Sequence, residues 1–264
     1  MYGSLHALEA LLCFVLGTIL GSFLNVVIAR LPEGGSLTYP PSRCPDCGNN
    51  IKFYDNIPII SFFLLKGRCR SCGGRIALRY PIIEFLAGFL SMALYLRFGL
   101  TPTFGVFLIF CAAMCAIFLI DLEHMIIPDV ISLNGIAVGL VVSTVGLLPH
   151  MDWKSSLVGA ITGAAVLYLP ALVYQKIRGS EGLGGGDIKL LAMIGAFNGL
   201  EGVLFVIFFS SLAGSITGIF SIIFRGSEST SPIPFGPFLT TSAVLYVFAG
   251  RRIVDHFYML SDYL

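Results

Sequence analysis

Charged residues are scarce in this chain. Of its 264 residues only 12% are charged, whereas 56% are hydrophobic, and the mean hydropathy is +0.89. Soluble domains carry about 25% charged residues, so a chain this poor in charge is expected to lie largely within a lipid bilayer. A surplus of positive charge is also absent, because the formal net charge is only +1, and this argues against nucleic acid as a partner.

Two common signatures of soluble enzymes are missing as well. No grouping of serine or cysteine with histidine stands out as a nucleophilic triad, and no G-x-G-x-x-G lies in a strand–helix–strand context. Catalytic chemistry would therefore have to come from other side chains, and no motif places a cofactor site.

Eight apolar runs make up most of the sequence. They cover approximately residues 8–29, 81–97, 103–120, 130–148, 156–175, 188–198, 202–224 and 236–250. The first run is long enough to cross hydrocarbon, which needs about 20 residues, and it lacks the basic start and the A-x-A-like cleavage site of a removable signal peptide. The run 188–198 is too short to cross a full bilayer at about 1.5 Å per residue. We therefore predict an all-α polytopic membrane protein with about eight membrane helices, one of them short.

The basic residues are unevenly distributed between these runs. Eight of the 16 lie in one polar segment, residues 30–80, which is cytosolic by the positive-inside rule. If the runs cross alternately, four more fall on the same side, namely Lys176, Arg178, Lys189 and Arg225. The remaining four, on the other side, are Arg97, Lys154, Arg251 and Arg252. We expect three parts: a first membrane helix (1–29), a cytosolic loop (30–80) and a membrane helix bundle (81–264).

The polar segment contains two cysteine pairs, Cys44-Pro-Asp-Cys47 and Cys69-Arg-Ser-Cys72, each followed by glycine. Two C-x2-C pairs are the usual framework of a four-thiolate zinc site, and the 21 residues between these pairs exceed the common range by only one. Four protein ligands leave no position for a catalytic water. Two disulfides are the alternative, and a cytosolic location disfavours them because thiols are kept reduced there. We predict a structural zinc ion bound by these four cysteines.

Two acidic stretches lie at the ends of apolar runs. The first, residues 118–129, contains Asp121 and Asp129, and the second, residues 181–189, contains Asp187 after three glycines. Ionisable groups at membrane depth are costly and mark functional sites by default. Two facing carboxylates can share a proton, so that one acts as a base toward water while the other polarises a scissile carbonyl. Glycines beside the second carboxylate would let a substrate backbone approach it.

A simpler interpretation is that the first stretch marks a wet turn between helices, with Asp129 capping the helix that follows. A G-x-G-D sequence alone is also weak evidence for catalysis. Two acidic stretches on the same predicted face, together with a tetracysteine loop, favour the catalytic interpretation.

These features together resemble the type IV prepilin peptidases, also called prepilin leader peptidase/N-methyltransferases. The resemblance covers nearly the whole chain and depends on the combination of motifs rather than on one of them. The matching motifs are Gly21-Ser-Phe-Leu-Asn25-Val26, Arg30-Leu-Pro32, the two cysteine pairs, Asn56-Ile-Pro58, Gly67-Arg-Cys69, Arg79-Tyr-Pro81 with Glu84, and the stretches 121–129 and 184–189. One departure is Phe53-Tyr54, where many members carry tryptophan.

The resemblance implies that Asp121 and Asp187 form the catalytic pair of a G-x-G-D aspartyl protease. The supporting residues that it implies are Gly184, Gly186, Lys189 and Asp129. It implies prepilins and the pilin-like subunits of type II secretion as substrates, cleaved at the cytosolic face of the bacterial inner membrane. It also implies methylation of the new N-terminus, with S-adenosylmethionine as methyl donor.

The methyltransferase pocket is expected between the zinc loop and the membrane face, because this loop is the only sizeable cytosolic body. Gly67, Arg79 and Glu84 flank the second cysteine pair and are candidates to line it, although loop packing and charge placement would explain them equally well. Two alternatives concern the whole chain. One is a zinc-stabilised membrane scaffold or transporter without catalysis. The other is a peptidase without methyl transfer, which the intact cysteine loop disfavours.

Overall fold

The computed structural model describes residues 2–149, 151–179, 184–225, 233–250, 252–254 and 256. Residues 181–183, which begin the second acidic stretch, and Arg251 lie outside this part of the chain. Every regular element in it is a helix, and the described residues contain isolated β-bridges but no strand. The prediction of an all-α fold is therefore confirmed.

The chain divides into two compact units, Met1–Ala112 and Ala113–Leu264, which we call the N-terminal and the C-terminal unit. The boundary lies inside α4 (Pro102–His124). The division into residues 1–29, 30–80 and 81–264 that the sequence favours remains a prediction.

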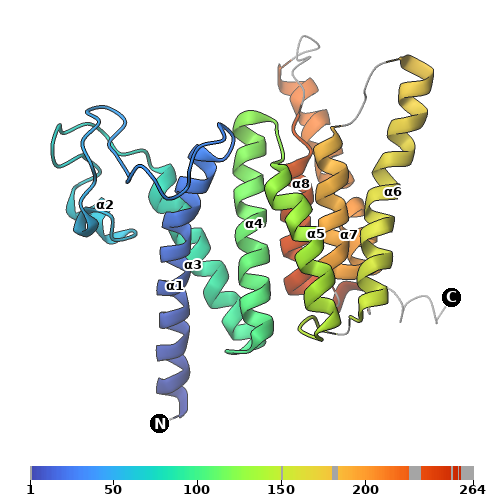
Figure 1. The fold of residues 1–264 in the computed structure, drawn as a ribbon, viewed down its shortest axis with the longest axis horizontal. Helices are drawn as coiled ribbons and strands as arrows, with labels where there is room; N and C mark the ends of the chain where they lie inside the picture. The colour runs from blue at the N-terminus through green and yellow to red at the C-terminus, as the bar shows by residue number, and fades with distance from the viewer. Residues whose placement is uncertain are drawn as a thin grey trace. The chain divides into compact units, whose positions relative to one another are not determined.

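The N-terminal unit is built on two long helices that lie side by side (Figure 1). Its elements are α1 (Tyr2–Arg30), η1 (Phe53–Asp55), α2 (Ile60–Leu64), α3 (Arg79–Phe98) and the start of α4. Glycines bring α1 close to α3, because a Cβ atom at Gly17 would lie 2.4 Å from the Ala87 carbonyl oxygen and one at Gly21 would lie 2.7 Å from the Glu84 Cα. Small residues are the usual means of tight packing between membrane helices.

The C-terminal unit is a bundle of helices packed in the same way. Its elements after α4 are α5 (Asp129–Thr144), α6 (Trp153–Arg178), α7 (Gly185–Arg225), α8 (Gly236–Leu245) and η2 (Tyr246–Gly250). A Cβ atom at Gly159 in α6 would lie 2.2 Å from the Gly195 carbonyl oxygen in α7. One at Gly135 in α5 would lie 2.4 Å from the Met193 sulfur, also in α7. The first half of α7 is therefore enclosed by α5 and α6.

Helix α7 is broken at Gly199, whose φ of 68° and ψ of −171° are not helical. The two halves run in opposite directions (Figure 1), so the chain turns back at this glycine. The second half then packs against α8, where the hydroxyls of Ser210 and Ser242 are 3.2 Å apart. The break confirms that residues 188–198 form a short helix separate from residues 202–224.

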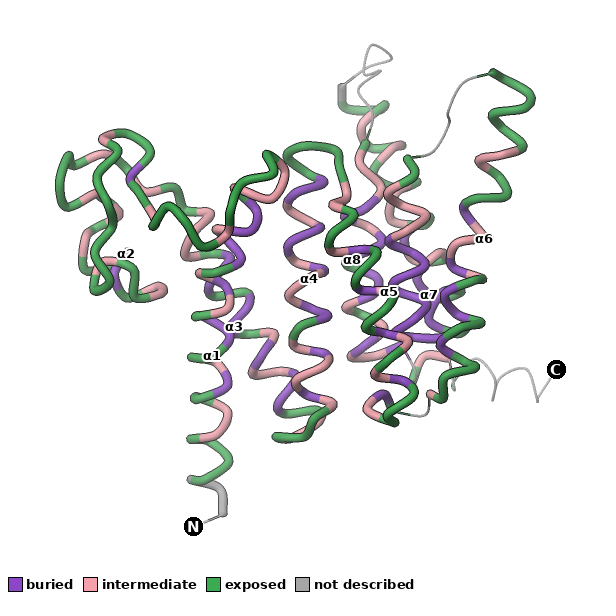
Figure 2. Tube along the Cα trace, viewed as in Figure 1, coloured by how far each residue is buried: buried purple, intermediate pink, exposed green. Residues whose placement is uncertain are grey.

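Within the part of the chain that the structure describes, five helices are long and apolar enough to cross a membrane: α1, α3, α4, α6 and α7. The apolar helices Asp129–Thr144 and Gly236–Gly250 are shorter, so the predicted count of about eight membrane helices is not confirmed. Exposed positions recur along α1 and α6 rather than only at their ends (Figure 2), and many of them carry large apolar side chains. This is the surface expected of a multi-pass membrane protein, whose outer side chains contact lipid.

Candidate metal cluster, cavity and carboxylate pair

The two cysteine pairs fold into matching turns. The Gly48 N–H donates to the Cys44 carbonyl oxygen and the Gly73 N–H to the Cys69 carbonyl oxygen, both at 2.9 Å. Gly48 and Gly73 have φ values of +70° and +72°, a left-handed conformation that glycine adopts without steric cost. Each C-x2-C-G segment therefore takes its shape from its own short sequence.

The two turns bring four thiols together. The sulfur atoms of Cys44, Cys47, Cys69 and Cys72 all lie within 4.8 Å of one another, and all four cysteines are free rather than disulfide-bonded. The Sγ atoms of Cys44 and Cys72 are 3.8 Å apart. Two thiolates on one tetrahedral zinc ion, with Zn–S bonds of about 2.3 Å, are about 3.8 Å apart. The predicted cluster is confirmed, and its donor set and spacing fit zinc.

An ion pair connects the second cysteine pair to η1. The Arg70 guanidinium donates to both carboxylate oxygens of Asp55, with its shortest hydrogen bond at 2.6 Å. These hydrogen bonds lower the pKa of Asp55. Next to Arg70, the backbone N–H groups of Cys72 and Ser71 lower the pKa of the Cys69 thiol to about 7. Since the thiolate is the form that binds metals, the turn itself favours the ligand form of Cys69.

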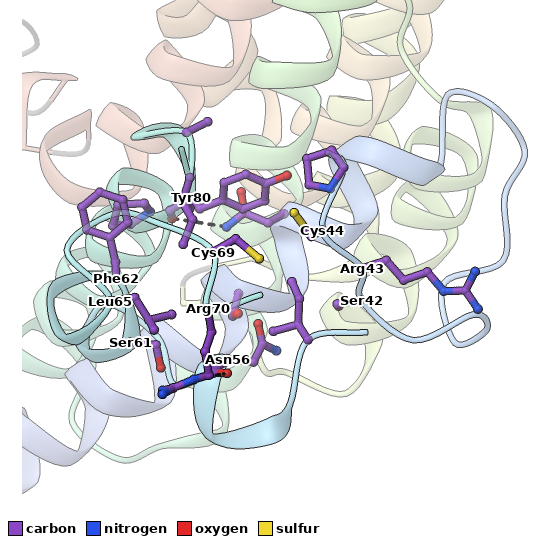
Figure 3. Close-up of a pocket in the computed structure, with 18 of the residues that line it drawn as sticks. Ser42, Arg43, Cys44, Asn56, Ser61, Phe62, Leu65, Cys69, Arg70 and Tyr80 are labelled. Atoms are coloured by element: carbon purple, nitrogen blue, oxygen red, sulfur yellow. Dashed lines mark hydrogen bonds and ion pairs between the residues drawn. The ribbon is translucent and has the colours of Figure 1, made fainter. Parts of the chain in front are cut away.

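A cavity of about 400 Å³ lies in the N-terminal unit, between the cysteine loop and the ends of α1 and α3. Figure 3 shows loop residues, among them Cys44, Cys69 and Arg70, grouped around it. Asn25 of α1 and Glu84 of α3 belong to the rest of its lining. Pockets of about 300–1,000 Å³ are typical of small-molecule sites, so the cavity is large enough for a cofactor.

Two of the three candidate cofactor residues border this cavity. Arg79 and Glu84 line it, whereas Gly67 is not among its lining residues. Gly67 instead lies next to Phe62, which does line the cavity, and a Cβ atom at position 67 would be 3.1 Å from the Phe62 ring. Gly67 also has a φ of +66°, so its place in the loop requires a residue without a side chain.

The wall of the cavity contains a strained turn. Ile59 has φ 62° and ψ −52°, and the N–H of Ile60 donates to the Pro58 carbonyl oxygen at 2.6 Å, which makes a γ-turn of the rare positive-φ kind. A β-branched residue in this conformation is a genuine outlier. The buried Glu84 accepts the Ile59 N–H at 2.7 Å and thereby holds the turn. Backbone strain of this kind clusters at ligand-binding sites.

A buried acceptor without a partner lies in the same wall. The Asn25 Nδ2 donates to the carbonyl oxygens of Gly21 and Tyr80, both at 3.3 Å, while its Oδ1 is buried and has no hydrogen-bond partner among the described residues. Leaving such an atom unsatisfied costs about 1–3 kcal/mol. An N–H group of a ligand in the cavity would satisfy it.

The acidic residues lie at helix ends in the C-terminal unit. Asp121 is in the last turn of α4, and Asp187 is in the first turn of α7. Asp121 is 5% exposed, and the two side chains are close enough for their charges to interact. Both carboxylates thus lie at helix ends of the same unit, and their action as a catalytic pair stays a prediction.

The glycines before Asp187 differ in their surroundings. A Cβ atom at Gly185 would have no described atom within 4 Å, and one at Gly184 would meet only the Asp187 carboxylate, at 3.5 Å. A Cβ atom at Gly186 would instead lie 3.0 Å from Ile127, so Gly186 allows close packing. Space for a substrate backbone is thus next to the first two glycines.

Asp129 and Lys189 form an ion pair between α5 and α7. The Lys189 Nζ lies 2.7 and 2.9 Å from the two Asp129 carboxylate oxygens. The N-cap of α5 is Pro128, which makes no side-chain cap hydrogen bond, and Asp129 is the next residue. The alternative in which Asp129 caps the helix is therefore wrong, since its carboxylate binds a neighbouring helix instead.

Sequence reasoning missed one contact of this site. The Asp121 Oδ2 accepts the N–H of Gly236, the first residue of α8, at 3.0 Å. Gly236 is 115 residues away along the chain. A glycine–proline step at the start of an apolar run was the only available signal, and it does not say which side chain lies beside it.

The structure thus defines a helical membrane protein with a tetracysteine loop and a pair of carboxylates at helix ends. Two family models match the chain: the bacterial peptidase A24 N-terminal domain over residues 15–98, and the type IV leader peptidase family over residues 108–219. The first match contains all four clustered cysteines and the second contains Asp121 and Asp187. The chain belongs to the type IV leader peptidase family.

Curated relatives are similar over most of their length. The chain is 36% identical to a prepilin leader peptidase/N-methyltransferase of Pseudomonas aeruginosa, with 96% of this chain and 94% of the relative covered. It is 35% identical to a protein of the same name from Xanthomonas campestris, with 91% of each covered. It is 38% identical to one from Myxococcus xanthus, over 89% of this chain and 71% of the relative. No solved structure matches the chain significantly.

Proposed function

We propose that the protein cleaves the leader peptides of type IV prepilins and pilin-like secretion subunits, and then methylates the new N-terminal amine. The names of its relatives contain both activities. The observation that carries the cleavage activity is the pair of carboxylates, Asp121 and Asp187, whose charges interact at helix ends of the C-terminal unit.

Asp121 and Asp187 act as an aspartyl protease pair that shares one proton. The ionised carboxylate takes a proton from water while the water oxygen adds to the scissile carbonyl carbon, and the protonated carboxyl donates to the carbonyl oxygen. A proton then passes to the leaving amine nitrogen, the C–N bond breaks, and the pair returns to its starting state. Gly184 and Gly185 leave space for the substrate backbone.

The reaction takes place at the cytosolic face of the bacterial inner membrane. Half of the basic residues lie in the segment 30–80, and by the positive-inside rule this segment is cytosolic. Alternating crossings from there put the last turn of α4 and the first turn of α7 on the same side. A prepilin lies with its leader in the cytosol and its apolar helix in the bilayer, so its cleavage point would reach this face.

Zinc bound by Cys44, Cys47, Cys69 and Cys72 stabilises the loop. Four thiolates complete a tetrahedral shell, so the ion has a structural role and takes no part in hydrolysis. A polar loop of this size has too few apolar side chains to fold without such a cross-link.

The cavity of the N-terminal unit binds S-adenosylmethionine, which when bound supplies the methyl group. The cofactor has a cationic sulfonium, an amino acid end and an adenine ring. The buried Glu84 offers a negative charge to a cationic centre, and its hydrogen bond to the Ile59 N–H holds it in position. The unpartnered Oδ1 of Asn25 accepts an N–H group, and Arg79 adds positive charge for a carboxylate.

Co-expression with a prepilin and mass spectrometry of the product test both activities together. The wild-type enzyme should remove the leader and add one methyl group to the new N-terminus. Asp121→Asn and Asp187→Asn should each lower cleavage about 10²–10⁴-fold, because asparagine keeps the size of the side chain but cannot share the proton. Both variants should remain in the membrane and should still methylate a pilin that was cut beforehand.

Near-normal cleavage by either variant would exclude the carboxylate pair. An enzyme that retains zinc but neither cleaves nor methylates would support the alternative of a membrane scaffold or transporter. Cleavage without methylation would reduce the function to that of a peptidase.

A further inference from the structure

The N-terminus of α8 has one backbone donor that the helix itself does not use. Pro237 has no N–H, and the N–H groups of Phe238 and Leu239 donate to the Phe235 carbonyl oxygen at 3.1 and 3.3 Å. This leaves the N–H of Gly236, which is buried and donates to the Asp121 Oδ2 at 3.0 Å. A buried N–H needs a partner, so this hydrogen bond fixes where Asp121 lies relative to α8.

The contact is possible only because position 236 has no side chain. A Cβ atom there would lie 2.5 Å from the Asp121 Oδ2 and 3.0 Å from its Cγ. The φ of Gly236 is not in the left-handed region, so the backbone itself would accept alanine. The requirement for glycine thus comes from the Asp121 carboxylate and not from the turn.

The hydrogen bond also suits a charged carboxylate. A backbone N–H at a helix N-terminus stabilises negative charge, and hydrogen bonds to an ionised acceptor are stronger than neutral ones. The described residues give the other oxygen, Oδ1, no hydrogen bond. One oxygen of Asp121 is therefore held by α8, and the other remains for water or for Asp187.

We propose that Gly236 is a positioning residue for leader cleavage: its N–H and its missing side chain hold the Asp121 carboxylate in the orientation that the reaction requires. This role rests on the proposed function of Asp121 and Asp187. It assigns to α8 a part in the site that is separate from the G-x-G-D segment. It predicts that a single added methyl group at position 236 displaces the carboxylate without touching the substrate.

The test compares Gly236→Ala with Gly218→Ala, using purified enzyme in detergent and a purified prepilin. A Cβ atom at Gly218 in α7 would have no described atom within 4 Å, so this variant controls for the glycine-to-alanine change itself. For Gly236→Ala we expect kcat to fall about 10²-fold, since a displacement of about 1 Å of a catalytic group has effects of that size. KM, the amount of enzyme in the membrane and methylation of a pre-cut pilin should stay near wild type. Gly218→Ala should cleave normally.

A second variant covers the case in which Gly236→Ala does not accumulate. In Asp121→Ala the crowded carboxylate is gone, so a methyl group at position 236 has room. The double variant Asp121→Ala/Gly236→Ala should therefore accumulate better than Gly236→Ala and have a melting temperature close to that of Asp121→Ala alone. If the double variant accumulates no better than Gly236→Ala, the crowding does not involve Asp121 and the proposal is overturned.

Two further results would overturn it. One is wild-type kcat in Gly236→Ala, and the other is a parallel loss of cleavage, methylation and protein level that the second variant does not reverse. Failure of the proposed function is distinguishable from both, because then the wild-type enzyme does not cleave prepilin, or Asp121→Asn and Asp187→Asn cleave as well as wild type.

Discussion

The two units of the chain hold their candidate sites by different means. In the N-terminal unit the site lies in a polar loop, shaped by short cysteine turns and by a cluster of thiols that fits a metal ion. In the C-terminal unit it lies at helix ends that glycine packing brings together, and its carboxylates depend on single contacts such as that with Gly236. The difference indicates that the two proposed reactions can be lost separately, and the following predictions test that separation.

Loss of the metal should have the largest of the expected effects, and it should be confined to the N-terminal unit and its methyl transfer. The protein is expected to contain about one zinc ion per chain, and Cys44→Ser should remove it, because three thiolates leave the shell incomplete. Since metal binding and folding of such loops are coupled, methyl transfer should fall below detection while leader cleavage persists. Metal analysis and both activity measurements on one preparation check this, with Cys13→Ser, a cysteine outside the cluster, as the matched control.

An equal loss of both activities in Cys44→Ser would contradict the separation of the two units. It would mean that the loop also serves substrate docking or overall stability.

Removal of Glu84 should weaken methyl transfer while the metal remains bound. Glu84→Ala removes the acceptor of the Ile59 N–H, so the γ-turn in the cavity wall should relax and methylation should fall, by up to about 10²-fold. Glu84→Gln keeps an acceptor but not the charge, so its methylation rate should lie between those of the wild type and Glu84→Ala. The rate of methylation of a pre-cut pilin checks this. Glu33→Gln, in the polar segment 30–80 but not lining the cavity, is the control.

If Glu84→Ala slows cleavage and methylation equally, the cavity is not specific to methyl transfer. The Arg79→Ala variant tests a second residue that lines the same cavity, and it too should affect methylation first.

The same contrast explains what could be predicted from the sequence. The cysteine cluster could be predicted because each pair is a local turn, and a metal requires the two pairs to converge. The helices could be predicted from the apolar runs, and the break near Gly199 could be predicted from the interruption between two of these runs. The contact of Asp121 with Gly236 and the unpartnered oxygen of Asn25 could not be predicted. They depend on which helices pack together, and apolar periodicity carries no information about that.

The ion pair between α5 and α7 should have a smaller effect, confined to the C-terminal unit. The Lys189 and Asp129 side chains are 38% and 56% exposed, so solvent screens them and their coupling should not exceed about 1 kcal/mol. Lys189→Met should lower kcat for cleavage only a few-fold and leave methylation unchanged. A double-mutant cycle with Asp129→Asn measures the coupling, and Lys176→Met is the control. A complete loss of cleavage in Lys189→Met would instead give this lysine a direct part in the chemistry.

The smallest expected effect concerns the ion pair beside the cysteine cluster, where Arg68 and Arg70 flank Cys69. Arg70 binds Asp55 through a two-pronged contact, whereas no side-chain hydrogen bond or ion pair of Arg68 is found among the described residues. Lysine keeps the charge but cannot reproduce the planar fork. Arg70→Lys should therefore make the loop exchange amide hydrogens slightly faster, and Arg68→Lys should not. Because the pair is partly exposed, the difference should shrink in about 1 M salt, where the Debye length is about 3 Å. Equal exchange in the two variants at low salt would show that the zinc cluster alone determines the order of the loop.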